Sequence, residues 1–189
     1  MGRLHHLIAD TLAAELLARR EWDEAPALCF LYVEGGKPRI SALPLPDEMW
    51  SADRPPAVLA RFAAISTSQS SLLSSVAPEG LHGAAFRCEA WEIDGGKPGT
   101  ARRSEALADS MAHRIEQRPD AREIRSIYAV DRAGITYAAV QRWGEDDVRR
   151  SIAFPGAGNG FSGTIPRALD QIVTAVLGVA MPNREGTGR

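Results

Sequence analysis

Residues 123–143 read EIRSIYAVDRAGITYAAVQRW and predict a β-hairpin. Both arms are rich in Ile, Val, Tyr, Thr and Trp, which suit a pleated, half-buried surface. Between the arms lies Asp131-Arg132-Ala133-Gly134. The Asp131 carboxylate can accept a hydrogen bond from a turn amide, and Gly134 stands where a short hairpin loop needs a positive φ. The hairpin fixes an architecture, but it carries no chemistry of its own.

Hydrophobic periodicity predicts further elements on both sides of this hairpin. Apolar residues at helical spacing indicate amphipathic helices, and β-rich runs bounded by turn residues indicate strands. Asp53 and Thr164 are expected to cap the helices that follow them, and residues 66–75 to form a loop or a weak helix. The predicted helices are Leu4–Arg20, one that begins after Asp53, Arg102–Gln117 and one from Thr164 to Leu177; the predicted strands are Ala27–Val33, Arg39–Leu43, Ala84–Ile93, the two hairpin arms and a short Ser151–Pro155.

The order of these elements, α-β-β-α-β-α-β-β-α, predicts an α+β fold. Hairpins supply antiparallel pairs, and the helices are too few for a βαβ array. We therefore expect a mixed or mainly antiparallel sheet of about five strands with flanking helices. Ala84–Ile93 alternates as if one face of the sheet were buried, and Arg125, Arg132 and Arg142 are expected to face solvent. Residues 1–182 are predicted to form a single domain, and residues 183–189 a disordered tail.

The chain has 189 residues, of which 44% are hydrophobic and 24% charged, and its net charge is −2. These values are ordinary for a soluble globular protein, and the near-neutral charge argues against non-specific nucleic-acid binding. Asp10 and Glu15 interrupt the N-terminal apolar residues as no signal peptide would, and the apolar stretch Ile172–Met181 is too short to span a bilayer. Cys29 and Cys88 lie in apolar runs as buried thiols, so we predict a cytoplasmic protein with no membrane contact. The dominance of Arg over Lys points to a high-GC bacterial genome or its phage.

The Gly-rich segment before the last helix is the strongest ligand-binding candidate. Residues 158–163 fit the pattern G-x-G-x-x-G, but the chain ends before the second strand that a dinucleotide site requires, so no cofactor is predicted. Two Gly-Gly-Lys-Pro turns, residues 35–38 and 95–98, could present basic tips to one ligand. The hypothesis is a small-molecule or phosphate-containing ligand, or an enzyme site, at residues 156–164. Its candidate residues are Gly158, Gly160, Gly163, Thr164, Lys37 and Lys97; the alternative is a flexible loop and two independent turns.

The sequence contains no catalytic or metal-binding constellation. Its histidines, His5, His6, His82 and His113, follow no metal-ligand spacing, and no Cys-x-x-Cys occurs. Cys88 with His82 or His113 would make a nucleophilic pair, but a thiol among apolar neighbours is normally inert. The acidic residues 145–147 are typical of a solvated loop, with a weak cation site as the alternative. We predict no catalytic residue and no metal ligand, and favour a protein that is not an enzyme.

Protein contact is the favoured type of interaction. Trp50 follows a proline-rich segment, and an exposed Trp with Met49 beside it would suit a protein contact, although packing of Trp50 onto the sheet edge is the favoured interpretation. Self-association through an edge strand or a helix face is the simplest form of such an interaction. Regulation through the Ser-rich residues 66–75 is a further alternative. The sequence thus predicts a non-catalytic protein that binds a protein partner or forms a homodimer.

Two segments resemble a family of uncharacterised actinobacterial or actinophage proteins. They are Phe86–Trp91 and Ile127–Tyr137. The resemblance implies no assigned activity and transfers no catalytic residue. The order of elements also resembles that of roadblock or longin-like α/β sandwiches, which implies an interaction or scaffold role. The helix predicted at Arg102–Gln117 is an extra element in that scheme.

Overall fold

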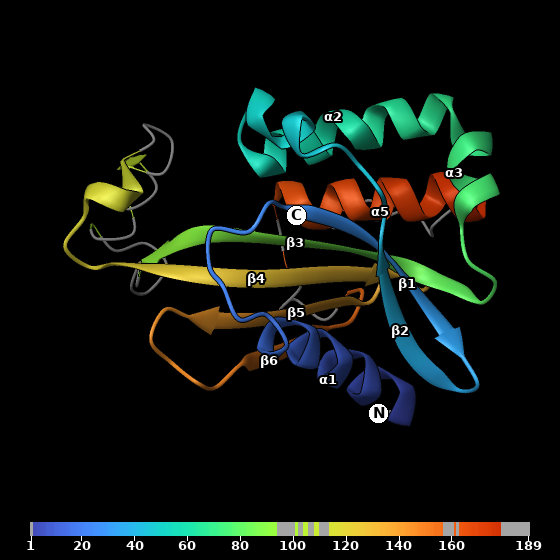
Figure 1. Cartoon of the computed structure of the whole chain (residues 1–189), viewed down its shortest axis with the longest axis horizontal. Coiled ribbons are helices and arrows are strands. Elements are labelled where there is room, and N and C mark those ends of the chain that lie inside the picture. Colours follow the sequence, from blue (N-terminus) through green and yellow to red (C-terminus); the bar gives the residue numbers. More distant parts are fainter. Residues whose placement is uncertain are drawn as a thin grey trace.

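Six strands form one antiparallel sheet in the order β2-β1-β3-β4-β5-β6 (Figure 1). The computed structural model describes residues 2–93, 101, 104–105, 108–109, 114–156, 161 and 163–178. The strands are β1 (Ala27–Glu34), β2 (Lys37–Ala42), β3 (Leu81–Ile93), β4 (Ala121–Asp131), β5 (Thr136–Arg142) and β6 (Arg149–Ala153). Strands β3 to β6 run as a meander, and the β1–β2 hairpin joins the sheet beside β3.

Helices cover both faces of the sheet, which gives the molecule three layers (Figure 1). Helix α1 packs on one face, and α2, α3 and α5 lie on the other. The α-helices are α1 (Arg3–Leu17), α2 (Pro55–Ser68), α3 (Ser70–Val76) and α5 (Thr164–Leu177), and the 3-10 turns are η1 (Asp47–Ala52) and η2 (Ile115–Gln117). Among the described residues, no helix combines the length and apolarity that crossing a membrane would need.

The predicted α+β class is confirmed, with a sheet one strand larger than expected. The sixth is the short strand predicted at Ser151–Pro155, which lies at Arg149–Ala153 and pairs with β5. Of the helix predicted at Arg102–Gln117, residues 104–105 and 108–109 are helical and the last three residues form η2, while half of the segment lies outside the described residues. The tail predicted at residues 183–189 also lies outside the described part of the chain.

The predicted hairpin is confirmed as β4 and β5, with the turn chemistry expected from its sequence. Asp131 Oδ1 accepts hydrogen bonds from the amides of Ala133 (2.8 Å) and Ile135 (3.0 Å). Gly134 has a φ of 74°, in the left-handed region that glycine enters at little cost. The carboxylate and the glycine together set the turn, and β3 and β6 extend the pair on either side.

The two faces of the sheet differ in side-chain size. Large side chains fill the α2/α5 side, where Trp50 packs against Phe86 with ring centroids 5.4 Å apart. On the α1 side, a row of small residues crosses neighbouring strands in register: Cys29, Ala85 and Ala129. Small side chains in a sheet let a helix approach its backbone closely, so α1 can insert Leu12 and other apolar residues against this row.

Three predicted details are wrong, and one open alternative is decided. Neither α2 nor α5 has a side-chain cap: Asp53 accepts hydrogen bonds from the Arg54 amide and the Arg61 guanidinium, and Thr164 is already the first helical residue. For residues 66–75 the helical alternative is confirmed, since they form the end of α2 and most of α3. Strand β3 is buried on both faces over residues 83–86, because α1 covers the face that was expected to be open, whereas Ala90 and Trp91 are exposed. Arg125 is buried, with 7% exposure, so it does not face solvent.

Docking of α1 on the sheet should stabilise the fold strongly. Leu12 is fully buried, whereas Leu17, at the end of the same helix, is 53% exposed. Leu12→Ala is expected to lower the free energy of unfolding by about 2–5 kcal/mol, because it leaves a cavity under α1. The matched control Leu17→Ala should change it by about 0.5 kcal/mol or less. Urea unfolding followed by circular dichroism measures both, and equal losses would show that α1 does not pack as described.

Candidate functional site

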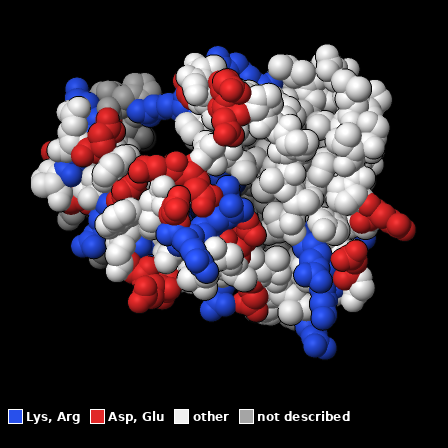
Figure 2. Space-filling view, viewed as in Figure 1, with Lys and Arg blue, Asp and Glu red and all other residues white. Residues whose placement is uncertain are grey.

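An apolar groove lies between the β2 end of the sheet and the helices α2 and α3. Its volume is about 370 Å³. Strand β1 supplies Phe30, and the other lining residues come from β2 and the segment after it, from α2 with Gln69, and from α3. They are Ser41, Ala42, Leu43, Pro44, Leu45, Phe62, Ile65, Ser66, Gln69, Leu72, Leu73 and Val76. None of these described lining residues carries a charge. Figure 2 shows a broad area of uncharged side chains at the end of the molecule where α3 lies.

Three large apolar side chains of the groove remain open to solvent. Ile65 is 56% exposed, and Leu72 and Val76 are each 63% exposed. Leu72 and Val76 are four residues apart on α3, so they lie on one stripe of that helix. A contiguous apolar patch on an exposed surface is typical of an interaction site, whereas single exposed apolar residues are not.

The protein-contact residues predicted from the sequence lie elsewhere. Trp50 is buried, with 6% exposure, and belongs to the core under α2 and α5; Met49 is half-buried against the same core. The buried Trp50 ring cannot serve as an exposed contact, because η1 turns it inward onto Phe86. Sequence reasoning missed Ile65, Leu72 and Val76. Ile65 gave no signal of exposure, because it fits the apolar spacing of the helix after Asp53. Leu72 lies within the Ser-rich residues 66–75, and Val76 directly follows them.

The predicted ligand residues are not brought together in the described structure. Gly158, Gly160 and Lys97 lie outside the described residues. Gly163 and Thr164 begin α5 on one face of the sheet. Lys37, on the β1–β2 hairpin, lines a separate open hollow of about 750 Å³ with Arg3, Leu4 and Leu7 of α1, the helix on the opposite face. Binding of a phosphate-containing ligand at residues 156–164 therefore stays a prediction, and Lys37 is no longer one of its candidate residues.

The two cysteines are buried free thiols with no catalytic geometry. Cys29 faces α1 and Cys88 faces α2 and α5, so the sheet separates them and they cannot form a disulfide bond. Burial raises the pKa of each thiol to about 11, which keeps both protonated at neutral pH. His82 precedes Cys88 by six residues of the same strand, a separation of roughly 20 Å in extended chain. That pair therefore cannot act as a nucleophile and its base, and His113 lies outside the described residues.

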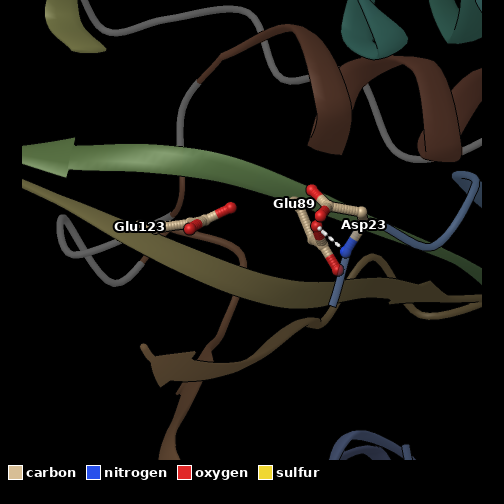
Figure 3. Close-up of side chains that lie close together, drawn as sticks. All are labelled: Asp23, Glu89 and Glu123. Carbon is tan, nitrogen blue, oxygen red and sulfur yellow. Dashed lines mark hydrogen bonds between the residues drawn. The ribbon is translucent and has the colours of Figure 1, made fainter. Parts of the chain in front are cut away.

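Three carboxylates approach one another near the linker between α1 and β1. Oxygens of Asp23, Glu89 and Glu123 lie within 4.8 Å of one another (Figure 3), whereas residues 145–147 form no such group among the described residues. Glu89 accepts hydrogen bonds from the amides of Asp23 (2.8 Å) and Glu24 (3.4 Å). Burial raises the pKa of Glu123, and the charges of Glu89 and Asp23 raise it further. Glu89 thus anchors the linker, which explains this cluster without a cation.

Arg125 holds the same linker from inside the sheet. Its Nε donates to Gln141 Oε1 (2.7 Å), and its Nη1 donates to the carbonyl oxygens of Arg19 (3.0 Å) and Glu21 (3.4 Å). The guanidinium lies 4.9 Å from the centre of the Trp22 ring, a cation–π contact. Burial lowers the pKa of Arg125. A charged group can be buried here because the linker supplies acceptors for it.

A chain of buried polar groups runs behind the hairpin turn. Tyr137 donates its hydroxyl proton to Asp131 Oδ2 (2.7 Å), so its oxygen accepts from His5 Nδ1 (2.8 Å). His82 Nε2 lies 3.7 Å from Asp131 Oδ2, and it has no hydrogen-bond partner among the described residues. Burial raises the pKa of Asp131, but His82, Tyr137 and two turn amides outweigh burial and lower it overall. The chain ties α1 to the hairpin and opens onto no described pocket.

No match was found among protein-family models, curated protein sequences or solved structures. The resemblance of Phe86–Trp91 and Ile127–Tyr137 to other proteins therefore stays a prediction. Function must be inferred from the residues of this chain, and the apolar groove is its most distinctive surface.

Arg125→Gln should destabilise the fold, because Gln cannot reach the linker carbonyls. We expect a loss of about 2 kcal/mol in the free energy of unfolding, the scale of hydrogen bonds from a charged donor. Arg132→Gln is the matched control: Arg132 is exposed on the hairpin turn and should tolerate the change within about 0.5 kcal/mol. Chemical denaturation measures both variants. Similar values for the two would place Arg125 in solvent.

Asp131→Asn should make the free energy of unfolding less dependent on pH in the acidic range. The folded-state pKa of Asp131 is lowered, so the ionised carboxylate stabilises the fold above the unfolded pKa of about 4, and this contribution is lost as pH falls through the folded pKa. At pH 7 the variant should be about 2 kcal/mol less stable than the wild type. The gap should narrow below about pH 4. Thermal melts from pH 7 to pH 2 test this, with exposed Asp146→Asn as control; a constant gap would contradict it.

Proposed function

We propose that the protein is a non-catalytic α+β module that acts by binding a protein surface in its apolar groove. The observation that carries the proposal is the exposure of Ile65, Leu72 and Val76 along one uncharged hollow. Exposing these side chains to water is unfavourable, and covering them would release about 25 cal/mol for each Å² of apolar area. A protein surface can cover all three at once.

The lining chemistry favours a protein over a small metabolite. Small-molecule sites usually combine an apolar wall with a few converging polar groups that fix orientation. Here the polar lining residues are Ser41, Ser66 and Gln69. The hydroxyl of Ser66 is already bonded to the Phe62 carbonyl oxygen (2.7 Å), which leaves little to orient a polar ligand. Apolar area and shape therefore dominate recognition, as at the centre of a protein interface.

The cysteines support a location in the cytoplasm, which we include in the proposal. Both are free, buried and separated by the sheet, an arrangement suited to a reducing compartment.

Site-specific photo-crosslinking in cells that express the protein tests this function. A photoreactive residue at position 72, in the groove, should give discrete adducts with protein. The same residue at position 17, an equally exposed leucine position on α1, should give none of these adducts. Adding Ile65→Glu should reduce the position-72 adducts about tenfold, because a charge would be desolvated in an apolar contact. Absence of adducts at position 72, or the same adducts from both positions, would contradict the proposal.

A further inference from the structure

The apolar groove borders a sheet edge with free main-chain groups. Strand β2 ends the sheet, and no described strand pairs with its outer side. The Leu43 amide donates to the Leu28 carbonyl oxygen (2.8 Å), towards β1. Because main-chain direction alternates along a strand, the amides and carbonyls of Ile40 and Ala42 point outward. The main chain of Pro38 also points outward, but proline has no amide hydrogen. Hydrogen bonds from this edge to a neighbouring strand can therefore come only from residues after Pro38.

The charge distribution restricts what can sit on this edge. An uncharged groove favours an uncharged partner surface, since a charge buried against it would be left without a counter-ion. Both described edges carry two exposed basic residues, Lys37 and Arg39 on β2 and Arg149 and Arg150 on β6. Only β2 lines the apolar groove, and its residues 40–42, next to the groove, carry no charge. An uncharged, apolar groove beside an unpaired strand edge can be covered by the same groove and edge of another copy of this chain.

We propose that a second copy of this chain docks on β2 and the apolar groove, forming a two-fold dimer with a continuous sheet. This inference rests on the proposed function and names its partner. With the two-fold axis at Ser41, Ile40 of each copy faces Ala42 of the other. Each of the two Ile40–Ala42 pairs exchanges two hydrogen bonds, which gives four in all. Arg39 then lies opposite Leu43 of the second copy, so like charges do not meet, and Glu34 of its own hairpin (3.8 Å) is its counter-ion.

The same symmetry covers the exposed apolar side chains. Both copies of α2 and α3 lie on one face of the continuous sheet, since the axis is perpendicular to it. Ile65, Leu72 and Val76 of the two copies then face one another across the seam. This is an isologous contact, in which the same patch serves both partners. The dimer would therefore pair the free edge of β2 and cover the apolar groove through one interface.

Light scattering after size exclusion is the first test. At a concentration of about 100 µM, a dimer with a micromolar dissociation constant is almost fully formed. The wild type should then have twice the 20.4 kDa mass of one chain. Leu72→Glu and Ala42→Pro should each raise the dimer dissociation constant about tenfold or more. Ala42→Pro removes only an outward amide, so the β1–β2 ladder should persist. Leu17→Glu is the control and should leave the dimer intact, and circular dichroism confirms folding of each variant.

Disulfide trapping tests the register. Ser41 of the two copies would form a non-hydrogen-bonded pair with Cα atoms about 4.5 Å apart, close enough for a disulfide bond. Mild oxidation of Ser41→Cys should therefore give a covalent dimer, while Ser151→Cys on the exposed β6 edge should not. The native cysteines are buried and should not interfere.

Two results would overturn the dimer. One is a monomeric wild type without Ser41→Cys dimers. The other is a wild-type dimer that Leu72→Glu and Ala42→Pro leave unchanged. In the first case, adducts of position 72 with a different protein would keep the proposed function and reject only the second copy as partner. Absence of both the dimer and the adducts would reject both.

Discussion

Burial of both faces of one sheet is the constraint on which the rest of this structure depends. A six-stranded sheet with helices on both sides leaves only its two edges open to another strand. The β6 edge is short and carries Arg149 and Arg150, a common protection against edge-to-edge pairing. The β2 edge carries the exposed Lys37 and Arg39 and Pro38 near the hairpin turn, and Pro44 follows the strand. Residues 40–42 between them carry neither a charge nor a proline, and the proposed association uses this segment.

Covering both faces also brings buried polar groups onto β4. Arg125, in the middle of the strand, reaches the backbone of the α1–β1 linker. Asp131, the last residue of the strand, organises the hairpin turn and reaches α1 through Tyr137 and His5. Both anchors hold the segment that brings α1 over the sheet. A buried charge left without acceptors would cost several kcal/mol, so these bonds favour one placement of α1 over others. They are structural, and their perturbed pKa values follow from that role.

The hairpin could be predicted because its determinants are local: Asp131 and Gly134 lie within the turn they shape. Arg125 could not, because its acceptors belong to residues about a hundred positions earlier, and alternation along a strand does not reveal whether a second helix layer covers the other face. The sequence left both packing and exposure open for Trp50 for a similar reason, since the direction of a 3-10 turn depends on the core beside it. The groove was missed because it needs β2, α2 and α3 together, and the Ser-rich residues 66–75 read as loop or weak helix.

Helix α3 is the element whose stability is hardest to explain from the described chain alone. It has seven residues and no buried one, and isolated helices of this length are marginal in water. Its attachments are the partial packing of Leu73 and a hydrogen bond from Ser74 to the Val176 carbonyl oxygen (3.0 Å). Leu72 and Val76 line the groove but stay largely exposed to solvent, so they contribute little buried area to the stability of α3. A partner that covered this stripe would stabilise α3 and fill the groove with the same contacts, so folding of α3 and binding at the β2 edge should be coupled.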